Sequence, residues 1–244
     1  MSKQGHFQII DVSRGVAIAL MIIYHFCFDL NYFGFASFHF STDPFWLNFR
    51  SIIVSSFLII MGISLAIATN KTLNVKKYLI RLLLLVTYAA IVSVSSFLMY
   101  PDSMIFFGIL HFVAFASVLA LLFTRLYWLN FILGSSIILF STLFKFQLFN
   151  LPYLQWIGLM THKPITEDYV PLFPWFGVVL IGLFLGKLLF IDTSSIFSEK
   201  YQNWSSNALI ARILAFGGRH SLHVYMLHQP ILIGLLYIIV SAKG

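Results

Sequence analysis

Charged residues are scarce in this sequence, and their scarcity excludes a water-soluble protein. Only 9% of the 244 residues are charged, whereas a soluble domain carries about 25%. Hydrophobic residues make up 60% of the chain, and the mean hydropathy is +0.92. The composition therefore indicates a protein that lies in lipid.

Cysteine is almost absent as well, because Cys27 is the only one. The chain can form neither an intramolecular disulfide nor a metal cage built from cysteine. The formal net charge of +7 raises the question of a nucleic-acid partner. However, the Lys and Arg residues are scattered between apolar stretches and form no basic stripe. We expect no nucleic acid, and membrane topology accounts for these charges better.

Long uncharged stretches predict membrane-spanning helices, because a helix needs about 20 mostly apolar residues to cross the hydrocarbon core. No small-residue cleavage site follows the first stretch, so we expect it to be retained. The expected spans are 9–30, 51–70, 82–101, 103–124, 126–144, 170–186 and 220–242. The predicted fold is all-α, a polytopic transmembrane helix bundle of about seven spans that forms one domain over residues 1–244.

Lys and Arg predict the orientation, because cytoplasmic loops carry an excess of them. With the N-terminus inside, eleven of the fifteen Lys and Arg residues fall on the cytoplasmic side. Only Arg50, Lys145, Lys163 and Lys243 fall outside. We therefore expect the N-terminus inside and the C-terminus outside. Two segments, 147–160 outside and 204–216 inside, are expected to lie on the membrane, the second with Ser205 and Ser206 as candidate N-caps.

Ionisable residues inside a span are costly to keep in lipid, so each is a candidate for function. His25 and Asp29 are four residues apart, which places them on one helix face within reach of each other. A carboxylate beside an imidazole fixes its tautomer and supports it as a general base. The alternative is a histidine that only forms a hydrogen bond to a neighbouring helix.

Two more histidines are expected inside spans. His25 lies fourteen residues beyond Asp11, about 21 Å along the helix axis, which places it toward the outer leaflet. His111 is expected at a similar depth, and His228 near the middle of the last span. The three histidines are candidates to line one cavity, although a packing role for His111 and for His228 stays open.

Cationic residues gather at the predicted cytoplasmic ends. Asp11 and Arg14 are three residues apart, and one interpretation is an intrahelical ion pair that makes burial tolerable. The other is a cationic mouth that binds phosphate groups. Its candidate residues are Arg14, Arg219, Lys76, Lys77 and Arg81.

Four motifs carry a resemblance to a known family. The run Ile-Asp-Val-Ser-Arg-Gly-Val-Ala at 10–17, continuing to His25 and Asp29, resembles the opening helix of the heparan-alpha-glucosaminide N-acetyltransferase catalytic-domain family. Phe-Gly-Ile-Leu-His at 107–111 and Pro-Leu-Phe-Pro-Trp-Phe-Gly at 171–177 are similar too. The closing motif is Gly-Arg-His-Ser-Leu at 218–222, followed by Tyr225, His228, Gln229 and Pro230. The small bacterial members look similar throughout, so we expect a multi-pass protein of the bacterial cytoplasmic membrane.

The resemblance implies acyl transfer across the membrane, from cytoplasmic acetyl-CoA to a sugar hydroxyl or amine at the opposite face. It places His25 and Asp29 in the first-helix motif, Arg14 in the Asp-x-x-Arg-Gly element and His228 in the closing motif. The animal enzymes are larger, and their proposed catalytic histidine lies in the stretch after this helix, where His39 is a loose match. We rank His25 above His39 as the base. No bound metal is implied, and a homo-oligomer stays open.

Several alternatives remain at the level of sequence. In direct transfer, His25 deprotonates the acceptor while His111 or His228 steadies the oxyanion; the alternative is an acyl-histidine intermediate. A transporter or flippase that uses the histidines as a proton relay is the second class of function, and no inverted repeat is evident to support it. A membrane cytochrome with paired histidines on haem iron is the third.

Overall fold

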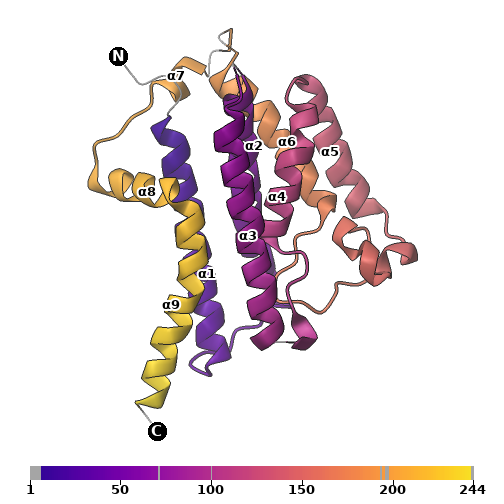
Figure 1. Ribbon diagram of the computed structural model, residues 1–244, viewed down its shortest axis with the longest axis vertical. Coiled ribbons are helices and arrows are strands. Elements are labelled where there is room, and N and C mark those ends of the chain that lie inside the picture. The colour runs from indigo at the N-terminus through magenta and orange to yellow at the C-terminus, as the bar shows by residue number, and fades with distance from the viewer. Residues whose placement is uncertain (1–6, 71, 100, 193, 196–197, 243–244) are drawn as a thin grey trace. The chain divides into compact units, whose positions relative to one another are not determined.

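The computed structural model describes residues 7–70, 72–99, 101–192, 194–195 and 198–242, and within them the chain is helical (Figure 1). Extended pairing in this part is limited to an isolated bridge between Phe107 and Tyr169. The prediction of an all-α fold is confirmed. The chain folds as two compact units: a terminal unit of residues 1–57 and 203–244, and a central unit of residues 58–202.

In the described part of the chain, five helices are long and apolar enough to cross a membrane. They are α1 (Gln8–Tyr32), α2 (Pro44–Thr69), α3 (Val75–Met99), α6 (Leu172–Phe190) and α9 (Ser221–Ser241). They correspond to five predicted spans, and α2 and α3 begin earlier because they include charged residues such as Arg50 and Arg81. The other two predicted spans correspond to shorter apolar helices, α4 (Ile109–Leu119) with the 3₁₀ turn η2 (Ala120–Phe123), and α5 (Trp128–Leu143). The number of seven spans and the orientation stay predictions.

The remaining elements are short. They are the 3₁₀ turns η1 (Pro101–Ser103), η3 (Gln147–Asn150) and η4 (Pro152–Ile157), with α7 (Ser198–Gln202) and α8 (Leu209–Arg219). The segment expected on the outer surface is thus two 3₁₀ turns, and the inner one, 204–216, includes most of α8. The N-cap of α8 is Ala208, which makes no side-chain cap, so the prediction that Ser205 or Ser206 caps this helix is wrong. Ser206 Oγ instead accepts a bond from the N–H of Ala208.

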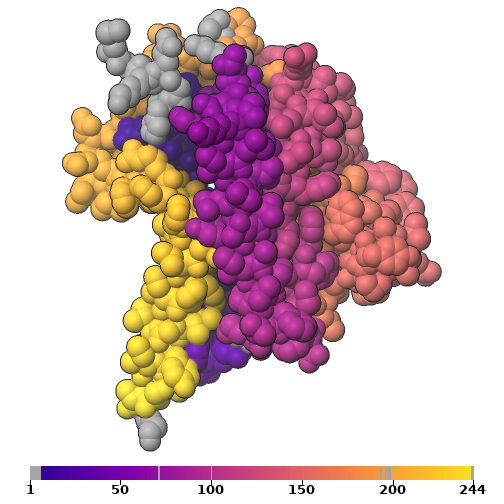
Figure 2. Space-filling view, viewed as in Figure 1, coloured from indigo at the N-terminus to yellow at the C-terminus, as the bar shows by residue number. Residues whose placement is uncertain are grey.

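In the terminal unit, α1 contacts both α8 and α9. Two glycines let α8 approach α1 closely: a Cβ on Gly15 would collide with the carbonyl of Leu214, and one on Gly218 with the carbonyl of Asp11. Small residues at such crossings bring helix backbones together in membrane proteins. Gln8 completes the contact, because its side chain both donates to and accepts from the backbone of Ser206 at 2.9 Å. Apart from the buried residues His228 and Leu236, α9 is largely exposed, and its surface is yellow in Figure 2.

In the central unit, α6 lies at the core, and its residues Val179, Leu180 and Leu183 are fully buried. Gly134 on α5 and Gly177 on α6 face each other so closely that a Cβ on either would lie 2.6 Å from the other's carbonyl oxygen. Because lipid tails are as apolar as leucine, such close packing is a main source of helix association in a membrane.

Polar bonds join the ends of α5 and α6 outside the apolar stretches. The Asp192 carboxylate accepts bonds from the hydroxyl of Ser194 at 2.6 Å, from its backbone N–H at 3.1 Å and from the Tyr127 hydroxyl at 3.2 Å. These bonds, those from Ser194 first, hold the pKa of Asp192 below its usual range. In the loop before α6, burial raises the pKa of the Tyr169 hydroxyl, which donates to the carbonyl of Gln155.

Candidate active site

Two predicted site residues meet where α1 packs against α9. The rings of His25 and His228 lie edge to face, with centroids 4.9 Å apart. Both helices belong to the terminal unit, and both are apolar enough to span a membrane. The imidazoles are thus brought together from opposite ends of the sequence, in a setting where polar side chains are rare unless they have a function.

Asp29 belongs to the same contact but has a partner that we did not predict. The residue is 2% exposed, and its Oδ1 accepts a 2.7 Å hydrogen bond from the side-chain amide of Gln229 on α9. Among the described residues, no hydrogen bond joins Asp29 to His25. The two residues share a helical face as predicted, but Gln229 is the group that fixes the carboxylate.

The geometry of His228 fixes its tautomer. Its Nδ1 lies 2.5 Å from the carbonyl oxygen of Tyr225, and a carbonyl can only accept, so Nδ1 carries the proton. The neutral ring therefore has its lone pair on Nε2. This nitrogen is buried and has no hydrogen-bond partner within the described part of the chain. His228 thus offers an acceptor, the form that a proton-accepting base requires.

Three buried acceptors without partners lie at this helix contact. They are His228 Nε2, Asp29 Oδ2 and Gln229 Oε1, each unpaired among the described residues. Most buried polar atoms in proteins form a hydrogen bond, so a group of unpaired ones needs an explanation. All three atoms accept hydrogen bonds, so the missing partner is a donor. The arrangement suits a substrate group that carries polar hydrogens.

An aromatic cluster adjoins His25 through Tyr24. The ring of Tyr24 lies edge to face with His25, at a centroid distance of 5.7 Å, and packs against Phe40, Trp46 and Phe49. Phe40 comes from the loop between α1 and α2, and its neighbour His39 is exposed. His39 stays a candidate catalytic base. Its position in the loop is restrained because the neighbouring Phe40 packs against Tyr24.

His111 lies in the other compact unit, on α4. Its Nε2 is 3.0 Å from the hydroxyl of Ser93, and that hydroxyl donates its one proton to the carbonyl of Ile105 at 2.6 Å. The serine oxygen must therefore accept from Nε2–H, which leaves the lone pair on Nδ1. Nδ1 is buried and unpaired in the described structure. The cavity predicted to hold all three histidines stays a prediction, because these two histidine sites belong to different units.

Arg14 makes the contact that its spacing predicted and one that was not predicted. One guanidinium nitrogen lies 3.4 Å from the Asp11 carboxylate, as expected for residues three apart, and also 3.4 Å from the carbonyl of Gly218. Arg14 is thus tied to the chain just before Arg219, which is exposed at the end of α8. The two arginines of the predicted phosphate-binding mouth therefore come from neighbouring segments.

The other predicted cations lie together at the start of α3 in the central unit. Lys76, Lys77 and Arg81 are all exposed there. The helix start is capped by Asn74, whose side-chain oxygen accepts a 3.0 Å bond from the N–H of Lys77. These residues stay candidates for phosphate contacts. Within the described residues, no group of three His, Cys, Asp or Glu side chains could hold a metal ion.

Gln229 is the site residue that the sequence-based prediction missed. A neutral amide inside an apolar helix carries no charge, so a search for ionisable residues passes over it. Its position was a usable signal, because it directly follows His228 and precedes Pro230 in the closing motif. Pro230 has no N–H, so it cannot continue the helical bond to the carbonyl of Met226.

Comparison with known protein families identifies the family of the chain. The family described as "Heparan-alpha-glucosaminide N-acetyltransferase, catalytic" matches residues 6–230. This range includes the Asp-x-x-Arg-Gly element, both histidines of the α1–α9 contact, and most of both units. No curated protein and no solved structure matches the chain.

Proposed function

We propose that this chain, which belongs to the heparan-alpha-glucosaminide N-acetyltransferase catalytic family, moves an acetyl group from cytoplasmic acetyl-CoA to a sugar or glycan at the opposite membrane face. Membership of the family and five helices that could span a membrane make the chain a membrane acetyltransferase. The donor, the acceptor and the direction of transfer are the proposal. The bacterial cytoplasmic membrane is the location that we propose.

One observation carries the proposal: next to the ring of His25 lie buried acceptor atoms of His228, Asp29 and Gln229 that have no partner among the described residues. A hydroxyl or amine acceptor would supply the missing donors and, at the same time, present the proton that must be removed. A contact that served only apolar packing would not explain these three acceptors. Burying each of them without a hydrogen bond costs about 1–3 kcal/mol of stability.

The reaction needs one base. The acceptor's nitrogen or oxygen attacks the thioester carbonyl, its N–H or O–H proton passes to the base, the carbon–sulfur bond breaks, and the CoA thiolate leaves and takes up the proton. We assign the base to His25, because its ring lies against that of His228 and it shares a helix face with Asp29.

The other histidines keep supporting assignments. His228 acts as a hydrogen-bond acceptor in its neutral form, so we assign it to hold the acceptor group or to stabilise the His25 imidazolium. We no longer assign it to steady the oxyanion. His111 likewise has an acceptor nitrogen, its Nδ1, that is unpaired among the described residues, and it stays a second candidate for contact with substrate. His39, exposed in the loop after α1, is the alternative base.

We assign binding of the CoA phosphates to Arg14 and Arg219, assisted by Lys76, Lys77 and Arg81. Two points support this assignment. A guanidinium group can donate two parallel hydrogen bonds to phosphate oxygens. In addition, the Arg14 side chain contacts the backbone carbonyl of the residue that precedes Arg219, so the two arginines come from neighbouring segments. His25 follows Arg14 by eleven residues, about 16 Å of helix, so donor phosphates and base would be separated by about half of the hydrocarbon core. We also propose that both units form one catalytic domain, because the family match runs across both.

The test is incubation of the purified protein with radiolabelled acetyl-CoA and a panel of sugars and envelope glycans. Labelled product together with free CoA supports transfer. Movement of a glycan across vesicle walls without acetylation would instead support the transporter or flippase. The haem alternative is disfavoured at His25 and His228. Their rings are in edge-to-face contact with centroids 4.9 Å apart, so a haem macrocycle does not fit between them.

A further inference from the structure

We propose that α8 lies in the membrane surface as an amphipathic anchor that binds anionic phospholipid headgroups through Arg212. The proposal concerns a surface outside the acetyl-transfer chemistry. It rests on two observations. One face of α8 packs against α1 while the other is exposed, and α8 lies at the ends of α1 and α9, two helices that could span the membrane.

The inner face of α8 is committed to α1. Ala215 and Gly218 are buried there, and the close approaches of Gly15 to Leu214 and of Gly218 to Asp11 leave no space for another partner. These contacts involve the beginning of α1, and α9 starts two residues after α8 ends. In Figure 1, α8 runs crosswise to both helices. A helix that crosses two spans at their ends lies where a bilayer has its surface.

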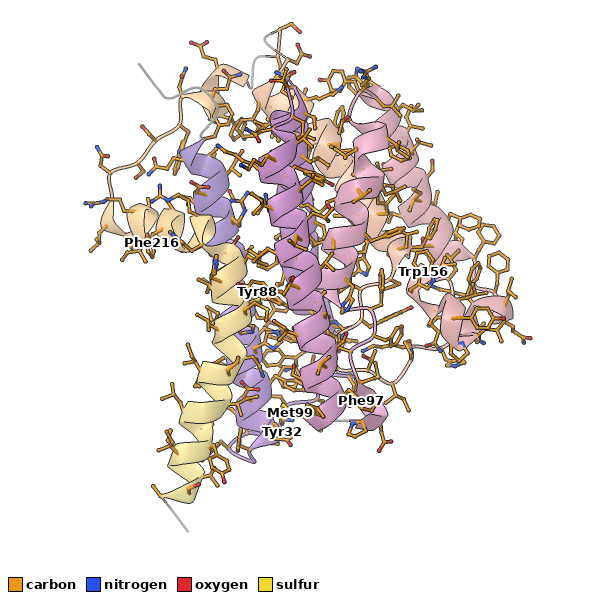
Figure 3. The ribbon with its side chains drawn as sticks, in the orientation of Figure 1. Tyr32, Tyr88, Phe97, Met99, Trp156 and Phe216 are labelled. Carbon is orange, nitrogen blue, oxygen red and sulfur yellow. The ribbon has the colours of Figure 1, made fainter. Side chains whose placement is uncertain are left out.

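The outer face of α8 is apolar and uncovered. Leu209, Ile210, Ile213 and Phe216 are between 61% and 72% exposed, and Phe216 is labelled in Figure 3. Leu209, Ile213 and Phe216 follow the i, i+4, i+7 spacing of one helical stripe. A helix with such a stripe and a charged flank is the type that lies in the interface with its apolar side among the acyl chains.

The two arginines of α8 lie on the same flank of the helix. Arg212 and Arg219 are seven residues apart and share a flank, whereas Ile210 lies nearly opposite Arg212 around the helix. Both arginines are exposed and border an open groove of about 450 Å³, which Gln8 and the apolar stripe also line. One flank thus offers guanidinium groups next to an apolar stripe. Anionic phospholipid has the complementary pattern, a phosphate next to acyl chains.

The test uses two measurements on the purified protein in lipid nanodiscs, and neither requires turnover. In a Cys27→Ser background, a bimane dye on Ile213→Cys reports contact with brominated acyl chains. Native mass spectrometry then counts the phosphatidylglycerol retained by wild type, Arg212→Gln and the matched charge control Arg125→Gln. We expect strong quenching at position 213. We also expect Arg212→Gln to weaken phosphatidylglycerol binding about fivefold, the contribution of one basic residue near a membrane surface, and Arg125→Gln to leave it unchanged.

Three results would overturn the proposal. Absence of quenching at position 213 would show that acyl chains do not contact α8. Equal retention of phosphatidylglycerol by Arg212→Gln and Arg125→Gln would mean that the lipid is held by the overall positive charge and not by Arg212. Displacement of the lipid by CoA, with CoA affinity lowered as much by Arg212→Gln as by Arg219→Ala, would make the groove part of the donor site. Acetyl transfer is measured separately, so failure of either proposal leaves the other testable.

Discussion

Asp29 near the end of α1 accepts a 2.7 Å hydrogen bond from Gln229 in the middle of α9. This bond joins two helices that are about 200 residues apart in the sequence, and it fixes the carboxylate at the contact that holds His25 and His228. In our account Gln229 therefore both positions Asp29 and offers its own Oε1 to the acceptor substrate, and its substitution should affect the chemistry without affecting the donor site.

Replacing Gln229 by Ala should lower kcat for acetyl transfer by about tenfold to a hundredfold. A bond to a charged group contributes about 1.5–3 kcal/mol, and its loss frees the carboxylate to move. The KM for acetyl-CoA should stay near that of the wild type. Gln202→Ala is the matched control, because Gln202 also donates one side-chain bond, to the carbonyl of Phe190. Equal effects of the two substitutions would remove the special role of Gln229.

The α1–α8 contact predicts a difference between two neighbouring glycines. A Cβ at Gly218 would collide with the backbone of Asp11, so Gly218→Ala should lower the free energy of unfolding by about 1–3 kcal/mol. Gly217 has open space around it, and Gly217→Ala should be neutral or stabilising by up to about 1 kcal/mol. Thermal unfolding in detergent, followed by tryptophan fluorescence, measures both. Equal melting temperatures for the two variants would mean that α8 does not pack on α1 this closely.

The distribution of Lys and Arg predicts the topology. Cysteines introduced at positions 76 and 212, in a background without Cys27, should be protected from an impermeant thiol reagent in intact cells. A cysteine at position 163 should be labelled. All three positions are exposed in the structure, so protection would come from the membrane and not from burial. External labelling at position 76 would reverse the orientation and place the cations on the wrong side for cytoplasmic CoA.

The donor assignment predicts a binding defect. Arg14→Ala or Arg219→Ala should weaken the binding of acetyl-CoA by about 1.5–3 kcal/mol, the range for a hydrogen bond to a charged group. Arg14 also contacts Asp11 and Gly218, so its variant needs a parallel measurement of unfolding. An unchanged Kd in the folded double variant would leave these arginines as topology signals and structural ion-pair partners.

Much of the fold could be predicted from sequence because lipid imposes a simple rule: uncharged stretches of sufficient length form helices. The rule placed α1, α6 and α9 within a few residues of their observed ends. It placed the starts of α2 and α3 too late, because charged residues at the membrane surface belong to the helix but not to the uncharged stretch.

The site was less predictable because it depends on contacts between distant segments. Helical spacing correctly placed Asp29 on the face of His25, and it predicted the contact of Arg14 with Asp11. It could not show that Asp29 is bonded to Gln229, or which nitrogen of His228 is protonated. Both depend on the neighbouring backbone and on helix α9, which only the three-dimensional structure supplies.

The central claim is that His25 removes the acceptor's proton, and the kinetics of His25→Ala test it most directly. We predict a fall in kcat of about two to four orders of magnitude, the usual contribution of general acid–base catalysis, with acetyl-CoA affinity near wild type. Asp29→Asn should cost less, and His25→Ala with Asp29→Asn little more than His25→Ala alone, because residues that act as a unit are not additive. His39→Ala is the matched control and should stay active. An active His25→Ala variant beside an inactive His39→Ala variant would contradict the account and move the base to the loop after α1.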